Sequence, residues 1–265
     1  MLSIDPMHIE TDSLSKHFGG VVALDDVSIE FPACQVTAVI GPNGAGKTTL
    51  FNVIAGFLQP DAGTVQLATN GSSVQNGVTL TGRKPHEIAR QGIGVLFQDI
   101  RVFGHLTALE NVAVGARNQI GESPLAALFR PSRIRTQEKA TLEAARVDLD
   151  FVGLADKAHV WAGNLSYGQQ KLVALARLLA SDAGIFLLDE PTSGIHPDMI
   201  PKLLVLIKRL ANDRGKAVIM VEHNLNVVRE FGDWVYLMAR GRVEVFGKPA
   251  EVLRDKSLKS MFPTL

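Results

Sequence analysis

The stretch "GPNGAGKT", from Gly41 to Thr48, decides the fold. It matches the pattern G-x-x-x-x-G-K-[ST] at every fixed position. Its glycines let the backbone turn so that successive N–H groups point at phosphate oxygens. Lys47 has the length to reach the β and γ phosphates, and the Thr48 hydroxyl is a suitable ligand for Mg²⁺. The stretch therefore predicts a phosphate-binding loop between a strand at 35–40 and a helix at 47–58.

Helices and strands are expected to alternate from residue 166 onward. The expected strands are 184–190, 216–223, 234–241 and 242–247, and the expected helices are 169–181, 197–213 and 225–231. Such alternation predicts an α/β fold whose mainly parallel sheet has helices on its faces.

The N-terminal part predicts a different kind of sheet. Apolar and polar residues alternate in places over 8–31, which is typical of antiparallel strands with one wet face. Residues 60–82 are rich in Gly, Asn, Ser and Thr, and they predict hairpins with turns at Asp61-Ala62-Gly63, Asn70-Gly71 and Asn76-Gly77.

The middle of the chain, residues 106–160, is mostly helical in pattern and contains a proline-bearing joint at 121–133. We expect one domain over 1–265, with its core and antiparallel β subdomain in 1–98 and 166–245. An inserted helical subdomain would occupy 99–165, and a C-terminal extension 246–265.

Composition excludes several classes of function. Lys plus Arg and Asp plus Glu each number 27, which argues against binding nucleic acid through bulk charge. Cys34 is the only cysteine, so an intramolecular disulfide is impossible, and we expect this residue to be small, apolar and buried. No apolar run approaches the roughly 18 residues needed to span a bilayer, and the N-terminus does not resemble a secretory signal.

Asp189 and Glu190 end the apolar run "GIFLLDE", at the edge where α/β sheets bind ligands. Asp189 is suited to hold Mg²⁺ through a water, and Glu190 to orient or deprotonate an attacking water. The alternative is an acidic turn before Pro191.

Gln98 and His223 stand at the ends of two other expected strands, 93–98 and 216–223. There the amide of Gln98 would reach Mg²⁺ or the water, and His223 would reach the γ phosphate. Each would otherwise be an ordinary polar strand end, because a lone histidine is a weak signal.

Ser166, in "NLSYGQQK" at 164–171, precedes an expected helix. It lacks the G-x-S-x-G spacing of a hydrolase nucleophile, and its simplest role is that of a helix cap. A serine cap, a glycine and free helical N–H groups also make an anion site. Since the chain already has a phosphate loop, a second such site makes sense if it serves a nucleotide bound to another subunit.

Five motifs, in this order, resemble the nucleotide-binding subunit of ABC transporters: "GPNGAGKTT", Gln98, "LSYGQQ", "IFLLDEP" and "VEHN". The resemblance covers about residues 8–255 and implies ATP and Mg²⁺ as ligands. It implies that Phe18 stacks on adenine, with a core aromatic as the alternative. It also implies γ-phosphate contacts across a dimer interface from Ser166, Gly168 and Gln169. The loop contacts would be Gly41, Pro42, Asn43, Gly44, Ala45, Gly46, Lys47, Thr48 and Thr49.

The sequence also departs from the family pattern. Tyr167 replaces a glycine of the signature motif, usually L-S-G-G-Q. His196 stands in "SGIH" where aspartate is usual, and Cys34-Gln35 where Gly-Glu is usual. Within the family, the chain looks most like the ATPase subunits of branched-chain amino acid or urea-type importers, although the terminal "MFPTL" differs from that subgroup.

The resemblance implies transmembrane permease subunits, a second ATPase subunit that is identical or similar, and a solute-binding protein as partners. It implies a cytoplasmic location at the inner face of the cell membrane and no nucleic-acid partner. Residues 99–112, "DIRVFGHLTALENV", would either dock on the permease or pack on their own core. Two alternatives remain: the motor of a lipid or drug exporter, and a soluble ABC-type protein acting on DNA or ribosomes.

Overall fold

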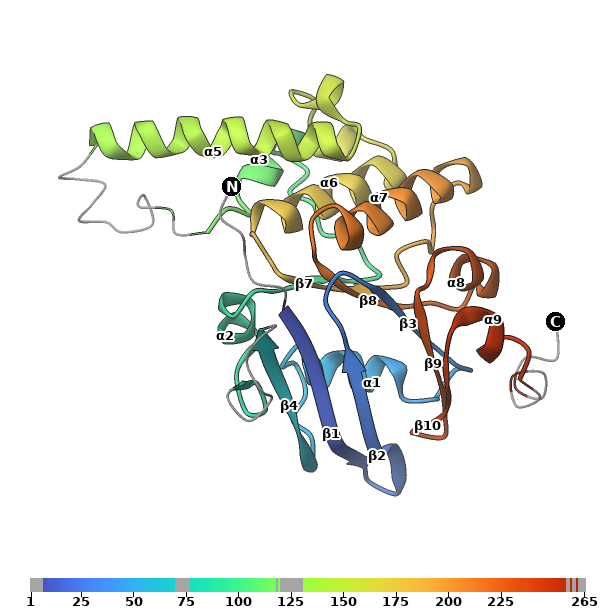
Figure 1. Ribbon diagram of the computed structural model, residues 1–265. Coiled ribbons are helices and arrows are strands. Elements are labelled where there is room, and N and C mark those ends of the chain that lie inside the picture. The colour runs from blue at the N-terminus through green and yellow to red at the C-terminus, as the bar shows by residue number, and fades with distance from the viewer. Residues whose placement is uncertain are drawn as a thin grey trace. The chain divides into compact units, whose positions relative to one another are not determined.

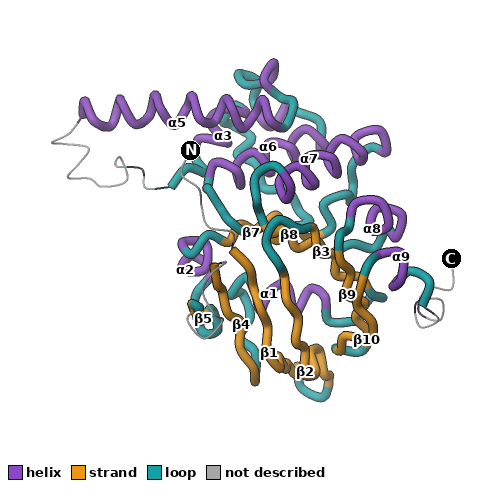
Figure 2. Tube along the Cα trace, in the orientation of Figure 1, coloured by secondary structure: helices purple, strands orange, loops and turns teal. Residues whose placement is uncertain are grey.

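The computed structural model describes residues 7–69, 77–117, 119, 131–255, 258 and 261. The backbone forms two compact units (Figures 1 and 2). The first comprises residues 1–98, 184–193 and 204–265, and the second comprises 99–183 and 194–203.

The first unit contains an antiparallel sheet in the order β2-β1-β4-β5. Its strands are β1 (Met7–Phe18), β2 (Val21–Phe31), β4 (Ala62–Thr69) and β5 (Val78–Thr79). The pairings β1–β2 and β1–β4 are both antiparallel, which confirms the prediction made for residues 8–31.

The turn expected at Asp61-Ala62-Gly63 was wrong, because β4 already begins at Ala62. Gly63 lies opposite a register shift of β1 and has a φ of +84°. A Cβ there would lie 2.4 Å from the carbonyl oxygens of Asp12 and Ser13, so the strand needs a glycine to pass this irregularity. The turns expected at 70–71 and 76–77 fall wholly or partly outside the described residues.

The same unit contains a six-stranded sheet in the order β10-β9-β3-β8-β7-β6. Its strands are β3 (Val36–Ile40), β6 (Ile93–Leu96), β7 (Ile185–Asp189), β8 (Ala217–Val221), β9 (Trp234–Ala239) and β10 (Arg242–Gly247). All neighbours are parallel except β9 and β10. The short, fully buried runs of β3 and β8 are typical of parallel strands covered on both faces, which confirms the predicted fold class.

Helices of this unit are α1 (Lys47–Ile54), α2 (Pro85–Arg90), α8 (Leu225–Phe231) and α9 (Pro249–Val252). The apolar side of α1 shares one hydrophobic cluster with side chains of both sheets, including Phe31 of β2 and Ile219 of β8. This shared core fixes the helix that begins at the glycine-rich loop.

Cys34, in the connection between β2 and β3, is exposed, so its expected burial was wrong. Its φ of +59° lies in the left-handed region, which glycine adopts readily and other residues rarely do. The sharp turn explains why the cysteine projects from the core.

The second unit is helical. Helices α3 (Ala108–Ala113), α5 (Pro131–Phe151) and α6 (Tyr167–Ala180) pack on one another, and α7 (Ile200–Asn212) begins in this unit and ends in the first. Helix α5 begins at Pro131, four residues before the expected "RTQEKA" start, since proline suits a first helical position. Residues 121–130 of the expected joint lie outside the described residues.

Among the residues that the structure describes, none of the helices combines the length and the apolar character needed to cross a bilayer.

Candidate nucleotide-binding site

The glycine-rich loop joins the end of β3 to the start of α1 and is tightly enclosed. A Cβ on Gly41 would lie 2.1 Å from the Met238 carbonyl oxygen, and one on Gly46 would lie 2.3 Å from that of Ala23. The φ angles of the two glycines, +152° and +100°, also disfavour other residues. Glycine is therefore required at both ends of the loop.

Lys47 is the one charged residue of this loop and is buried, with only 5% of the residue exposed. Its ammonium donates hydrogen bonds to the carbonyl oxygens of Gly41, at 2.8 Å, and Pro42, at 2.9 Å. Burial lowers the pKa of Lys47, while the negative charges of Glu190 and Asp189 oppose that shift. The lysine thus lies in the electrostatic field of both predicted catalytic carboxylates.

The N-terminus of α1 is suited to an anion. Gly46 is the N-cap and has no side chain with which to cap the first turn, so the N–H groups there remain available. Thr48 is exposed, while Thr49 is partly buried. A cavity of about 640 Å³ lies beside the loop, lined by Pro42, Asn43, Gly44, Ala45, Ala239, Arg240, Glu244 and Met261.

Glu190 follows the end of β7 in a left-handed backbone conformation, with a φ of +44°. Its N–H donates to the Val221 carbonyl at 3.0 Å, and its carbonyl accepts from the Ser193 N–H at 3.0 Å. These bonds aim the carboxylate so that its Oε1 lies 2.6 Å from Nε2 of His223. The structure therefore brings together two of the predicted catalytic residues.

Asp189, the last residue of β7, is partly buried. Burial raises the pKa of its carboxyl group, and the negative charge of Glu190 acts in the same direction, whereas His223 and Lys47 oppose the shift. Positive charge from a bound cation would favour the ionised form of this group.

Gln98 is exposed and lies two residues beyond the end of β6. Strand β6 is the neighbour of β7 in the sheet. The Gln98 amide, the Thr48 hydroxyl and the Asp189 carboxylate are the three groups predicted to hold Mg²⁺, and each carries an oxygen donor. In the described residues, no three or more His, Cys, Asp and Glu side chains form a metal cage. The oxygen donors fit Mg²⁺, which commonly keeps waters and phosphate oxygens as its other ligands.

Glu222, which the sequence analysis did not single out, connects the two catalytic turns. It is 3% exposed, and its Oε1 accepts hydrogen bonds from the Thr192 hydroxyl, at 2.7 Å, and the Thr192 N–H, at 3.1 Å. Its Oε2 accepts from the His223 N–H at 3.3 Å. In the sequence, the only sign of this role is that Glu222 directly follows an apolar run. The prediction for this strand end was made for the next residue, His223.

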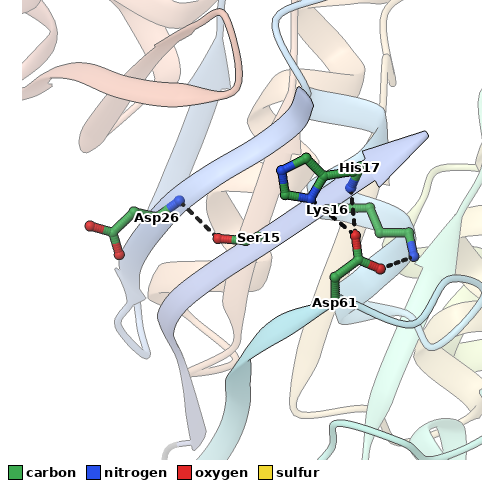
Figure 3. A network of polar contacts seen from close by, with 5 residues as sticks. All are labelled: Ser15, Lys16, His17, Asp26 and Asp61. Atoms are coloured by element: carbon green, nitrogen blue, oxygen red, sulfur yellow. Dashed lines mark hydrogen bonds and ion pairs between the residues drawn. The ribbon is translucent and has the colours of Figure 1, made fainter. Parts of the chain in front are cut away.

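Phe18 is the last residue of β1 and is 49% exposed, so the core alternative was wrong. The end of β1 that carries Phe18 is held by Asp61, which was predicted only as a turn residue (Figure 3). Asp61 accepts hydrogen bonds from the Lys16 ammonium at 2.6 Å and the His17 N–H at 2.7 Å. The same ammonium lies 5.7 Å from the centre of the Phe18 ring.

In the helical unit, Ser166 caps α6. Its hydroxyl accepts a hydrogen bond from the Gln169 N–H at 3.3 Å, and the Gln169 side chain accepts one from the Ser166 N–H at 3.0 Å. The predicted cap is therefore confirmed. Tyr167 packs against Gly194, where a Cβ would lie 2.9 Å from the tyrosine ring. This contact joins "LSYGQ" to the "SGIH" loop that contains the exposed His196.

A glycine-rich loop between the buried strand β3 and a helix, with a carboxylate pair at the end of β7, a parallel strand of the same sheet, defines a P-loop nucleotide-binding protein. The sequence model described as "ABC transporter" matches residues 24–193. The chain belongs to the ABC transporter family. This assignment confirms the resemblance seen in the sequence, and with it the expectation of an ATPase subunit.

One relative is the high-affinity branched-chain amino acid transport ATP-binding protein BraF of Pseudomonas aeruginosa, 35% identical over 93% of both chains. Among solved structures, the ADP conformation of an ATP-binding cassette of an ABC transporter is 32% identical. The TM-score is 0.80, and the alignment covers 98% of this chain and 99% of that one. A dimeric bacterial ABC transporter cassette is 28% identical, with a TM-score of 0.71 and coverage of 91% and 98%.

Proposed function

We propose that this chain is the ATP-hydrolysing subunit of an importer for branched-chain amino acids or a related small polar solute. The contact of 2.6 Å between Glu190 and His223, beside the buried Lys47, carries the proposal of hydrolysis. The name of the relative BraF supports the class of solute.

Each part of the site has a distinct task in this proposal. The backbone N–H groups of the loop bind the phosphates, Lys47 neutralises their charge, and Phe18 stacks on the adenine ring. Mg²⁺, held by Thr48, Gln98 and Asp189, would supply further positive charge to the phosphates.

In the chemical step, Glu190 is the general base. Its carboxylate takes a proton from the attacking water as the new bond to the γ phosphorus forms and the bond to the β–γ bridging oxygen breaks. The products are ADP and inorganic phosphate. His223, whose Nε2 lies 2.6 Å from Oε1 of Glu190, would hold this carboxylate and contact the γ phosphate.

A second ATPase subunit completes the site. Ser166, Gly168 and Gln169 of that subunit would contact the γ phosphate, so ATP stabilises the closed dimer through contacts that the open state lacks. The dimeric cassette among the solved structures supports this arrangement. The helical subdomain, 99–165, would pass the motion to permease subunits at the cytoplasmic face of the membrane, and a solute-binding protein would deliver the cargo.

Glu190→Gln tests the proposal on the assembled complex. We expect steady-state ATP hydrolysis to fall by about 10² or more while ATP binding persists, because the amide cannot take the proton. The control is Glu230→Gln, which makes the same charge change at an exposed position on α8. Equal turnover in the Glu190 variant and the parent would overturn the assigned role.

A further inference from the structure

A second pocket lies in the first unit, lined by none of the residues placed at the nucleotide site. Its cavity is about 300 Å³, within the range of small-molecule sites. The lining residues come from the end of β2, the connection to β3, and strands β9 and β10: Glu30, Pro32, Gln35, Trp234, Tyr236 and Phe246.

Three aromatic rings form its wall. The Tyr236 and Phe246 rings are stacked, with centroids 5.7 Å apart and an angle of 25° between their planes. Trp234 lies against the same phenylalanine, at 6.4 Å and 42°. Tyr236 and Phe246 are register partners in the β9–β10 pairing, so the backbone fixes the arrangement of these rings.

Phe246 belongs to the edge strand β10 and is 62% exposed. Tyr236, in contrast, is held from behind: its ring meets Phe31 edge to face at 6.1 Å, and its hydroxyl donates to the Glu30 carbonyl at 3.1 Å. The wall is therefore rigid on its inner side and keeps an aromatic surface in contact with water.

The charge of the pocket is negative. Glu30 is the one charged residue among the six that line it, and none of the six is basic. Burial raises the pKa of the Tyr236 hydroxyl, its hydrogen bonds to the Glu30 backbone and to Trp234 oppose that shift, and the Glu30 charge adds a smaller rise. The lining of the pocket includes Glu30 together with the three rings. Asp233, the residue before Trp234, forms an ion pair with Lys208.

We propose that this pocket binds a small organic cation with an alkylammonium head. Aromatic faces carry negative electrostatic potential and attract such cations, and a carboxylate at the rim adds to the attraction. A neutral apolar ligand of the same shape would gain only the hydrophobic part of the binding energy. The site is separate from the phosphate loop, so it does not depend on the proposed function.

Choline and its neutral carbon isostere, 3,3-dimethylbutan-1-ol, are the matched probes. Binding is measured by calorimetry and by fluorescence of Trp234 in a Trp161→Phe background, because the chain has only two tryptophans. We expect choline to bind at least about tenfold more tightly than the isostere. Saturating ATP should leave the affinity for choline unchanged.

Variants separate the two sources of attraction. Glu30→Gln should weaken choline binding several-fold without affecting the isostere, whereas Glu230→Gln should change neither. Phe246→Ala should abolish choline binding, and Phe246→Tyr should retain it. Retained ATP binding in each variant shows that the chain is folded. Equal affinity for the two probes, or no binding of choline at millimolar concentrations, would overturn the proposal.

Discussion

The Nε2 atom of His223 lies 2.6 Å from the Oε1 atom of Glu190, at the carboxyl ends of two neighbouring parallel strands. Glu190 reaches this position with a φ of +44°, a conformation that costs a residue with a side chain about 1 kcal/mol or more. The buried Glu222 fixes the turns on both sides. The fold thus maintains local backbone strain where the carboxylate meets the histidine.

Substitution of His223 tests whether the pair acts as a unit. We expect His223→Ala to lower kcat by about 10² with little change in ATP affinity, because the histidine orients the carboxylate and contacts the γ phosphate. In the double variant with Glu190→Gln, the losses should be far from additive. Additive losses, measured as phosphate release by the assembled complex, would show that the two residues act independently.

Lys47→Ala removes the buried ammonium from the phosphate loop. We expect the Kd for ATP to rise by roughly 10- to 100-fold, since hydrogen bonds to charged groups contribute about 1.5–3 kcal/mol. Calorimetry with ATP measures the change, and Lys202→Ala, at an exposed position, serves as the control. An unaltered ATP affinity in the Lys47 variant would contradict the phosphate-binding role.

Asp61→Asn tests the carboxylate beside Phe18. Hydrogen bonds from Lys16 and the His17 backbone lower the pKa of Asp61 from 3.8 to about 2 in the folded protein. Because the folded pKa is the lower one, the ionised carboxylate stabilises the fold fully above about pH 5, and this contribution is lost as the pH falls through 3.8 toward 2. The stability advantage over the variant should therefore be constant near neutral pH and shrink in acid.

Urea unfolding of both proteins across this pH range measures that advantage. Asp213→Asn is the control, because its carboxylate pairs with Arg209 at the surface, away from Phe18. We also expect Asp61→Asn to weaken ATP binding several-fold, because the strand end that carries Phe18 loses its anchor. A stability difference that does not vary with pH would count against the ionised contact.

Cys34→Gly should stabilise the protein. The residue has a φ of +59°, which costs a non-glycine residue about 1–2 kcal/mol, while the greater freedom of glycine in the unfolded chain offsets about half of that. We expect Cys34→Gly to exceed Cys34→Ala by about 1 kcal/mol in free energy of unfolding. Equal stability of the two variants in urea would show that this turn is unstrained.

Local patterns were enough to predict most strands and helices. The phosphate loop, the parallel strands and the Ser166 cap each depend on residues close together in sequence, such as the reciprocal bonds of Ser166 and Gln169. The path of β4 was not predictable in this way. Ala62 and Gly63 have turn-like composition, but pairing with the irregular part of β1 makes them a strand.

Two contacts of the site could not be predicted from the sequence, because each joins residues that are far apart along the chain. Asp61 and Lys16 are 45 residues apart in sequence, so no local pattern reveals their contact. Glu222 follows an apolar run, and its role becomes visible only when the turn of Thr192 lies beside it. The functions of Glu190, His223 and Gln98 stay predictions, although the structure places them at the ends of three successive strands.

The shared site is tested most directly by the specific ATPase activity of the purified chain over a wide range of protein concentrations. If the phosphate loop of one chain needs Ser166 of another, activity per chain must rise with concentration and approach zero on dilution. Activity per chain that stays constant down to concentrations far below any association would show that one chain hydrolyses ATP alone and would contradict the account.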